Sequence, residues 1–103
     1  MNEAIKLDLP LDAIREYCGT QPIRRLSVFG SAVRGELAPE SDIDLLVEYL
    51  PNARIGLFGM GGHLMDLSDF VGQRVELCTP NGLSKYIRDE VLVSARLIYE
   101  KES

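Results

Sequence analysis

Two aspartates one residue apart, Asp42 and Asp44, lie within an apolar stretch that has the pattern of a strand. Aspartate is depleted from strands, and side chains at positions i and i+2 of a strand project from the same face. Two carboxylates held this close repel each other unless a cation lies between them. The pair therefore predicts a metal site, and the surrounding apolar residues predict the strand that positions it.

A third acid, Glu76, lies in the later apolar stretch over residues 73–79. If these two stretches are neighbouring strands, Asp42, Asp44 and Glu76 converge on one face. They then give the all-oxygen ligand set that Mg2+ prefers. Such a site suits in-line displacement at phosphorus, which predicts phosphoryl or nucleotidyl transfer. The alternative for Glu76 is an exposed strand carboxylate paired with Arg74 or another neighbour.

The Gly30-Ser31 pair ahead of the aspartates is a candidate phosphate-binding turn. Glycine lets backbone N–H groups approach a phosphate closely, and a helix start supplies the positive end of its dipole. Ser31 would hold a phosphate oxygen. Arg34 either adds charge beside the leaving pyrophosphate or stabilises the acidic loop. A bare Gly-Ser pair is commonly only a turn, so this prediction depends on the aspartates that follow it.

Length and composition limit the class of protein. The 103 residues, 46% of them hydrophobic and 26% charged, predict one globular domain over residues 1–103. The net charge of -5 argues against a nucleic-acid backbone as direct partner, and we interpret Arg24-Arg25 as solvated. The apolar stretches are too short to span a membrane. Cys18 and Cys78 have no metal-binding spacing, which predicts free core thiols and a cytoplasmic protein.

Hydrophobic periodicity predicts the elements that position these residues. Helices are expected over 9–18, 32–35, 55–70 and 81–93, and strands over 23–29, 42–49 and 73–79, with 96–99 either a short extension or a further strand. The predicted inward residues of these elements are Leu11, Ile14, Cys18, Ile43, Leu45, Val47, Leu64, Leu67, Phe70, Val71, Val75, Leu77, Leu83, Ile87 and Val91, with Tyr86 as a further candidate. The face of the second strand opposite the core then carries Asp42, Asp44, Leu46 and Glu48.

Four glycines interrupt the third predicted helix between residues 56 and 62. Each costs about 1 kcal/mol relative to alanine inside a helix, so we expect the regular part to begin near Gly62 or His63, after a mobile segment. His63 is interpreted as a polar residue at the helix start rather than as a base. The spacing of the glycines fits neither a P-loop nor a dinucleotide fingerprint, which favours a flexible segment able to rearrange against a partner.

The motifs together strongly resemble those of minimal nucleotidyltransferases in the DNA polymerase beta-like superfamily. The resemblance rests on Gly30-Ser31-Ala32-Val33-Arg34-Gly35, on residues 41–47 and on Val75-Glu76-Leu77, and it continues to Leu97-Ile98-Tyr99. It implies an α/β (α+β) nucleotidyltransferase fold, a small mixed β-sheet flanked by about four helices. It also implies that Asp42 and Asp44 bind metal, that Gly30 and Ser31 bind phosphate, and that Glu76 matches a third acid that is usually aspartate.

The same resemblance implies a function. Members of this family are often encoded beside a HEPN-domain ribonuclease toxin and act as its antitoxin, in some cases by adenylylating a tyrosine of the toxin with ATP and Mg2+. The resemblance thus implies a protein adenylyltransferase in a hetero-oligomer with its toxin. Glu76 departs from the pattern: its extra methylene moves the carboxylate by about 1.5 Å, and such a misplacement can cost about 100-fold in rate. The alternative hypothesis is a weak or silent enzyme that neutralises its partner by binding and masking it.

Overall fold

The computed structural model of this chain describes residues 9–30, 33 and 42–101. The elements are α1 (Leu11–Gly19), β1 (Ile23–Phe29), β2 (Ile43–Tyr49), α3 (Leu57–Val71), β3 (Val75–Cys78), the short 3-10 turn η1 (Pro80–Gly82), α4 (Lys85–Ser94) and β4 (Arg96–Glu100). The helix predicted over 32–35 lies outside the described residues apart from Val33. None of the described helices is both long and apolar enough to cross a membrane.

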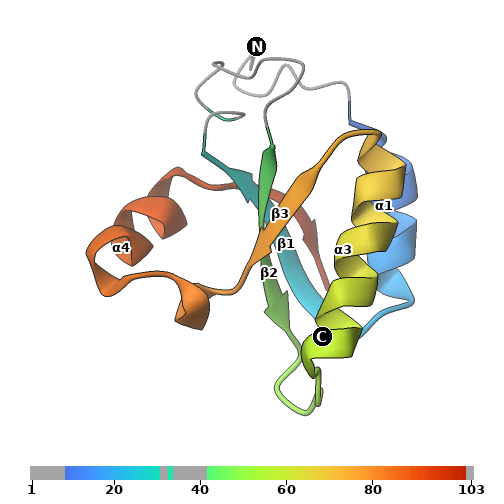
Figure 1. Cartoon of the computed structure of the whole chain (residues 1–103), viewed down its shortest axis with the longest axis horizontal. Coiled ribbons are helices and arrows are strands. Elements are labelled where there is room, and N and C mark those ends of the chain that lie inside the picture. Colours follow the sequence, from blue (N-terminus) through green and yellow to red (C-terminus); the bar gives the residue numbers. More distant parts are fainter. Residues whose placement is uncertain (1–8, 31–32, 34–41, 102–103) are drawn as a thin grey trace.

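The four strands form one mixed sheet in the order β3-β2-β1-β4. β1 pairs antiparallel with both β2 and β4, whereas β2 and β3 run parallel. Parallel neighbours need a crossover connection, and α3 provides it between β2 and β3. Helices α1 and α3 lie together on one side of the sheet, and α4 lies on the other (Figure 1). The predicted mixed sheet with flanking helices is confirmed, and residues 96–100 are a strand.

The main core lies between the sheet and the pair α1 and α3. The strand residues predicted to face inward, Ile43, Leu45 and Val47, are all buried there. Ile14 and Cys18 of α1 and Leu67 of α3 belong to the same core cluster. Its other buried members are Ile23, Leu26, Val28, Val75 and Ile98. Burying each large aliphatic side chain contributes about 1.5 to 3 kcal/mol. The first face of β2 is therefore fixed by packing, which sends its alternate residues to the opposite face.

A second, smaller core lies under α4, on the face that carries the aspartates. Leu46 is 2% exposed and packs with Leu83 and Val91, beside Phe29 and Cys78. The prediction that Tyr86 and Ile87 point inward is wrong, because they are 84% and 46% exposed.

The start of α4 explains this error. The Ser84 hydroxyl caps the helix by accepting from the Tyr86 N–H, so the helix begins at Lys85 rather than at residue 81. Residues 80–82 form a separate 3-10 turn, in which the Gly82 N–H donates to the Thr79 hydroxyl. Leu83 therefore lies outside the helix, and the apparent 83, 87, 91 stripe is not continuous.

Helix α3 begins at Leu57, so the expected start near Gly62 or His63 is wrong. His63 and Leu67 of α3 are buried against the rest of the protein. The first turn is already hydrogen-bonded, with the Met60 N–H donating to the Gly56 carbonyl at 3.0 Å, so the three glycines inside the helix do not interrupt it. The helix ends as its glycine predicts: Gly72 adopts a left-handed conformation with φ of 80°, and its N–H bonds the Ser68 carbonyl. Of the other predicted inward residues, Phe70 is on the exposed side.

Candidate functional site

The site begins with two carboxylates on neighbouring parallel strands. Asp44 of β2 lies directly across from Glu76 of β3 in the strand register. Because Ile43 and Leu45 face the main core, both acids lie on the opposite face, under the side of the sheet that α4 partly covers. Neighbouring strands are about 4.8 Å apart, which brings the two carboxylates within reach of one cation. The condition on which the convergence of Asp44 and Glu76 depends, that their strands are neighbours, is met.

Cys78 lies close enough to both carboxylates to feel their charge. It lies two residues beyond Glu76 on the same face of β3, opposite Leu46. Burial raises the pKa of the Cys78 thiol, and the negative charges of Glu76 and Asp44 raise it further. One thiol therefore senses both carboxylates. Cys18 and Cys78 are both free, with Cys18 in the main core and Cys78 half-buried at the edge of the second core.

Gly30 closes the site from the end of β1. Phe29 lies across from Asp44, so the chain leaves β1 beside the aspartate. Gly30 has φ of 79°, and a Cβ at this position would overlap the Oδ2 atom of Asp44. Only glycine satisfies both conditions without strain. Ser31 and Arg34, the other predicted phosphate-binding residues, lie outside the described residues.

Asp42, the first residue of the aspartate pair, has a cationic neighbour. Its Oδ1 atom lies 3.7 Å from the Nε atom of Arg74, just before the two strands begin. The Ile43 N–H donates to the Arg74 carbonyl at 2.9 Å, which aligns the two chain segments at this point. Arg74, the alternative partner of Glu76, thus forms an ion pair with Asp42. Sequence reasoning missed this contact between Arg74 and Asp42.

The donor atoms fit a hard divalent cation. Carboxylate oxygens are the ligands that Mg2+ prefers, and Gly30 leaves open backbone beside Asp44, where a side chain would intrude. Within residues 9–30, 33 and 42–101, no group of three or more His, Cys, Asp or Glu side chains is placed to hold a metal ion. The structure shows Asp44 and Glu76 opposite each other on neighbouring strands. The three-residue ligand set with Asp42 stays a prediction.

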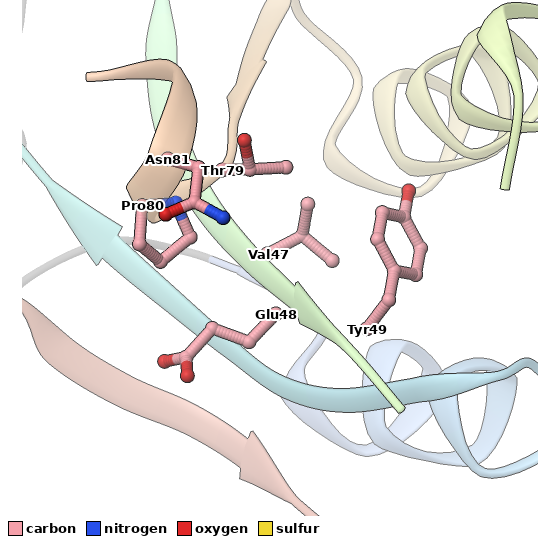
Figure 2. Close-up of a pocket in the computed structure, with 6 residues that line it drawn as sticks. All are labelled: Val47, Glu48, Tyr49, Thr79, Pro80 and Asn81. Carbon is pink, nitrogen blue, oxygen red and sulfur yellow. The ribbon is translucent and has the colours of Figure 1, made fainter. Parts of the chain in front are cut away.

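A pocket of about 440 Å³ opens at the far end of β2, lined by Val47, Glu48, Tyr49, Thr79, Pro80 and Asn81 (Figure 2). The pairing with β3 stops at Leu46 and Cys78, so the last residues of β2 have no β3 neighbour. The volume is in the range of small-molecule sites. Sequence reasoning missed this pocket; its only signal was Pro80, which ends β3 early and turns the chain away.

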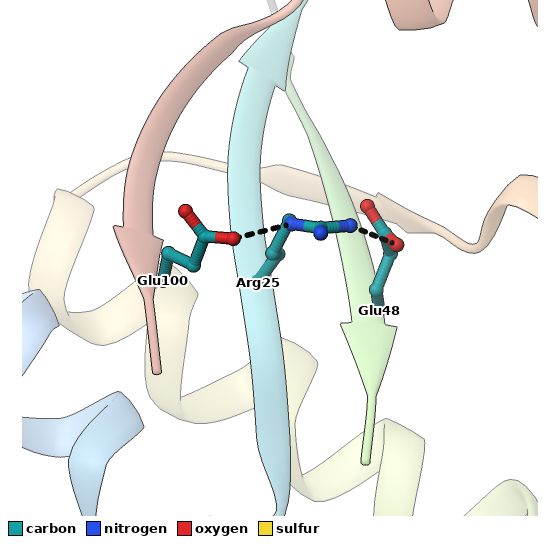
Figure 3. A network of polar contacts seen from close by, with 3 residues as sticks. All are labelled: Arg25, Glu48 and Glu100. Atoms are coloured by element: carbon teal, nitrogen blue, oxygen red, sulfur yellow. Dashed lines mark hydrogen bonds and ion pairs between the residues drawn. The ribbon is translucent and has the colours of Figure 1, made fainter. Parts of the chain in front are cut away.

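Glu48, which lines this pocket, forms an ion pair with Arg25 of the central strand β1. The Arg25 guanidinium donates to Glu48 at 2.9 Å and to Glu100 at 3.0 Å, so that one arginine links β2, β1 and β4 (Figure 3). The interpretation of Arg25 as merely solvated is therefore wrong. Its place on a central strand between two acidic neighbours explains the contacts. Both carboxylates raise the already high pKa of Arg25, so it stays charged.

His63 is a buried structural group on the other side of the sheet. Its Nδ1 atom lies 2.9 Å from the Tyr49 hydroxyl, and its Nε2 atom lies 3.1 Å from Oε1 of Gln21. Burial lowers the pKa of His63, an effect that the nearby Asp66 partly offsets. The neutral ring fits both contacts, with Nε2 donating to Gln21 and Nδ1 accepting from Tyr49. The prediction that His63 lies at the start of the helix is wrong, because His63 lies in the middle of α3.

Comparison with known proteins agrees with this geometry. The family model described as "Polymerase beta, Nucleotidyltransferase" matches residues 12–103. Two proteins of Methanocaldococcus jannaschii, each named "Putative protein adenylyltransferase", are similar to the chain. One is 34% identical over 80 residues, covering 71% of this chain and 76% of its own length. The other is 31% identical over 71 residues, covering 67% and 69%.

Solved structures share the fold. One described as "Structure of putative minimal nucleotidyltransferase" is 32% identical, has a TM-score of 0.70 and covers 82% of this chain and 85% of that one. A toxin-antitoxin structure with AMP-PNP has a TM-score of 0.73 at 17% identity, covering 91% of this chain and 76% of that one. A mutant of the toxin-antitoxin MntA-HpeT has a TM-score of 0.69 at 14% identity, covering 91% and 75%. With its parallel carboxylate-bearing strands and a family match over most of its length, the chain belongs to the polymerase beta nucleotidyltransferase family.

Proposed function

We propose that this chain is a cytoplasmic, single-domain, Mg2+-dependent protein adenylyltransferase that serves as an antitoxin. It transfers AMP from ATP to a hydroxyl, in our proposal a tyrosine, of a HEPN-domain ribonuclease toxin. The observation that carries the proposal is the placement of Asp44 across from Glu76, with Gly30 packed against Asp44. The names of the two Methanocaldococcus relatives support protein adenylylation, and the toxin-antitoxin structures, which share the fold, support the partner class.

The proposed reaction is one displacement at phosphorus. The acceptor oxygen attacks the α-phosphorus of ATP, the bond from that phosphorus to the bridging oxygen breaks, and pyrophosphate leaves. Asp42, Asp44 and Glu76 would hold Mg2+, which when bound neutralises charge that develops on the phosphate oxygens. Gly30 and Ser31 hold phosphate oxygens through backbone and hydroxyl groups, and Arg34 adds positive charge. Glu76 either completes the ligand set or takes the proton of the acceptor hydroxyl.

An apolar surface beside the site supports a protein as acceptor. Tyr86 and Val93 of α4 are 84% and 85% exposed, and Leu97 of β4 is exposed as well. Helix α4 packs on the same face of the sheet that carries Asp44 and Glu76. Large exposed apolar side chains near a reactive face are typical of protein interaction sites. We propose that the toxin docks on this α4 surface and presents its hydroxyl to the carboxylates.

The proposal is tested by label transfer. The purified chain, ATP labelled at the α-phosphate, Mg2+ and the HEPN toxin are expected to give labelled toxin. Asp44→Asn is expected to abolish labelling, because it removes a charged oxygen ligand. Glu100→Gln is the matched control, since Glu100 is an acid bound to Arg25 rather than part of the proposed site. Labelling that survives Asp44→Asn contradicts the mechanism.

A second candidate function is neutralisation by masking alone. The ion pair between Arg74 and Asp42 favours it, because Arg74 occupies one of the proposed metal ligands, and Glu76 is longer than the usual third acid. Masking needs no metal, so the variant Asp42→Asn/Asp44→Asn is expected to rescue growth of toxin-expressing cells if masking suffices. Failure of that variant to rescue, with its toxin binding intact, favours modification.

A further inference from the structure

Helix α3 presents a large apolar surface to solvent on the side of the protein opposite the carboxylates. Phe58 is 95% exposed and Leu57 is 85% exposed, and Met65 is exposed two turns later. Between Arg54 and Asp66 the chain has no charged residue at all, although 26% of the whole sequence is charged. A contiguous uncharged face of this kind is typical of an interaction surface.

The shape of this surface suits a second helix. Phe58, Gly62 and Met65 lie at i, i+4 and i+7, so they share one side of α3, while His63 and Leu67 on the other side are buried. A Cβ built on Gly61 or Gly62 would have nothing within 4 Å. Their bare backbone lets another helix approach closely between the two large side chains. A small apolar cavity of about 210 Å³, lined by Leu57, Met60, Gly61, Leu64 and Leu77, opens beside them.

The charges around the surface make it complementary to itself. Arg54 precedes the helix, while Asp66 and Asp69 lie in its second half, and all three are exposed. An antiparallel copy of α3, centred between Gly61 and Gly62, brings Phe58 to Met65 twice over. It also sets the N-terminal end of each helix, which Arg54 precedes by three residues, beside the half of the other helix that carries Asp66 and Asp69. The two helix dipoles then oppose each other, which is the favourable orientation. Self-complementarity about a two-fold axis is the requirement for a closed dimer.

We infer that this chain forms a two-fold symmetric homodimer through an antiparallel contact between the two copies of α3. The contact lies on the face of the sheet opposite Asp44 and Glu76, so it leaves both carboxylates and the α4 surface open. The occupant of the α3 surface is thus a second copy of the chain, and the homodimer presents two separate sites. This inference is independent of the proposed adenylyl transfer.

Sedimentation equilibrium of the purified chain over a concentration series tests the inference. The wild type is expected to dimerise, and Phe58→Asp is expected to raise the dimer dissociation constant by about 100-fold or more, because each dimer loses two buried rings. Phe58 is almost fully exposed in one copy, so the variant is expected to keep the wild-type melting temperature at monomer concentrations. Val93→Asp is the matched control: it is equally exposed on α4 and is expected to leave dimerisation unchanged.

Charge reversal tests the orientation. Arg54→Asp is expected to raise the dissociation constant by about 10-fold, because it places two acidic pairs across the interface. The double variant Arg54→Asp/Asp69→Arg is expected to restore the wild-type constant. A wild type that is monomeric at all concentrations overturns the homodimer, as does a dimer that Phe58→Asp leaves intact. If the wild type does not dimerise and Phe58→Asp loses toxin binding, the α3 surface binds the toxin instead, and the homodimer inference is overturned.

Discussion

The Oδ2 atom of Asp44 occupies the space that a side chain on Gly30 would need. The end of β1 and the carboxylate of Asp44 on β2 are therefore packed closely against each other. The contact links the phosphate-binding turn predicted from sequence to the pair of acids on β2 and β3. Any residue other than glycine must displace the aspartate or move the turn.

Gly30→Ala is predicted to reduce adenylyl transfer by more than about 10-fold, because displacement of a reacting group by about 1 Å is already costly. It is also predicted to lower the free energy of unfolding by about 1 to 2 kcal/mol, through the left-handed backbone alone. Gly72→Ala is the matched control, since Gly72 has the same positive φ but open space around it. Gly72→Ala is expected to lose similar stability in thermal melts while keeping its activity. Equal activity losses in the two variants would contradict a specific role for the contact with Asp44.

Magnesium is predicted to stabilise the wild type, because it relieves repulsion between Asp44 and Glu76 on neighbouring strands. Glu76→Gln is expected to raise the melting temperature slightly without Mg2+, since like charges directly opposite each other are destabilising by a few tenths of a kcal/mol. The same variant is expected to lose most of the rise in melting temperature on adding Mg2+. Differential scanning fluorimetry with and without Mg2+ measures both effects, with Glu48→Gln on β2 as a control that removes an acid outside the proposed ligand set. A wild-type response to Mg2+ in Glu76→Gln argues against Glu76 as a ligand.

Stability is predicted to fall as the pH drops below about 6.5, the ordinary pKa of histidine. Burial lowers the pKa of His63, so the unfolded chain binds a proton at a pH where the folded protein does not. The contribution of His63 to the free energy of unfolding is fully present above the pKa that His63 has in the unfolded chain. It is lost as the pH falls through the lower pKa of His63 in the folded protein. Urea unfolding at pH 7.5, 6.5 and 5.5 measures it. His63 is the only histidine in the chain, and His63→Gln is expected to flatten this part of the profile. An unchanged slope in that variant would assign the effect to carboxylates.

Leu46→Ala is predicted to destabilise the protein by about 2 to 4 kcal/mol, because Leu46 is buried at the centre of the second core beneath α4. Ile87→Ala is predicted to cost less than about 1 kcal/mol, since Ile87 faces outward on the same helix. Chemical denaturation of the two variants compares the costs. The reverse order would mean that α4 has the phase expected from its sequence pattern, with Ile87 inward.

The strand that carries Asp44 was predictable because apolar and acidic residues alternate along it. Alternation puts Ile43, Leu45 and Val47 in the core, and this alone sends Asp44 to the opposite face. The sequence left open whether the strand of Glu76 is a neighbour of this strand; in the structure α3 connects the two strands and they pair in parallel. The site was predictable from sequence to the extent that it depends on the faces of strands.

Other features depend on contacts that no local pattern encodes. Helix α3 begins at Leu57, where the Met60 N–H already bonds the Gly56 carbonyl, although the glycines that follow disfavour a helix. The phase of α4 is decided by one hydroxyl, that of Ser84. The partner of Arg74 depends on which acid lies nearest to it where β2 and β3 begin. Differences of a few ångströms decide this, and the order of residues does not specify them. The pocket near Pro80 exists only because β3 ends before β2 does.

The edge position of β3 has a consequence for the two acids. Asp44 stands on a strand with neighbours on both sides, whereas Glu76 stands on a four-residue strand that β2 alone holds in the sheet. Short edge strands open locally at a smaller free-energy cost than central ones. Brief detachment of β3 would therefore separate Glu76 from Asp44 while the main core stays closed, so hydrogen exchange at β3 reports how often the pair of acids is assembled.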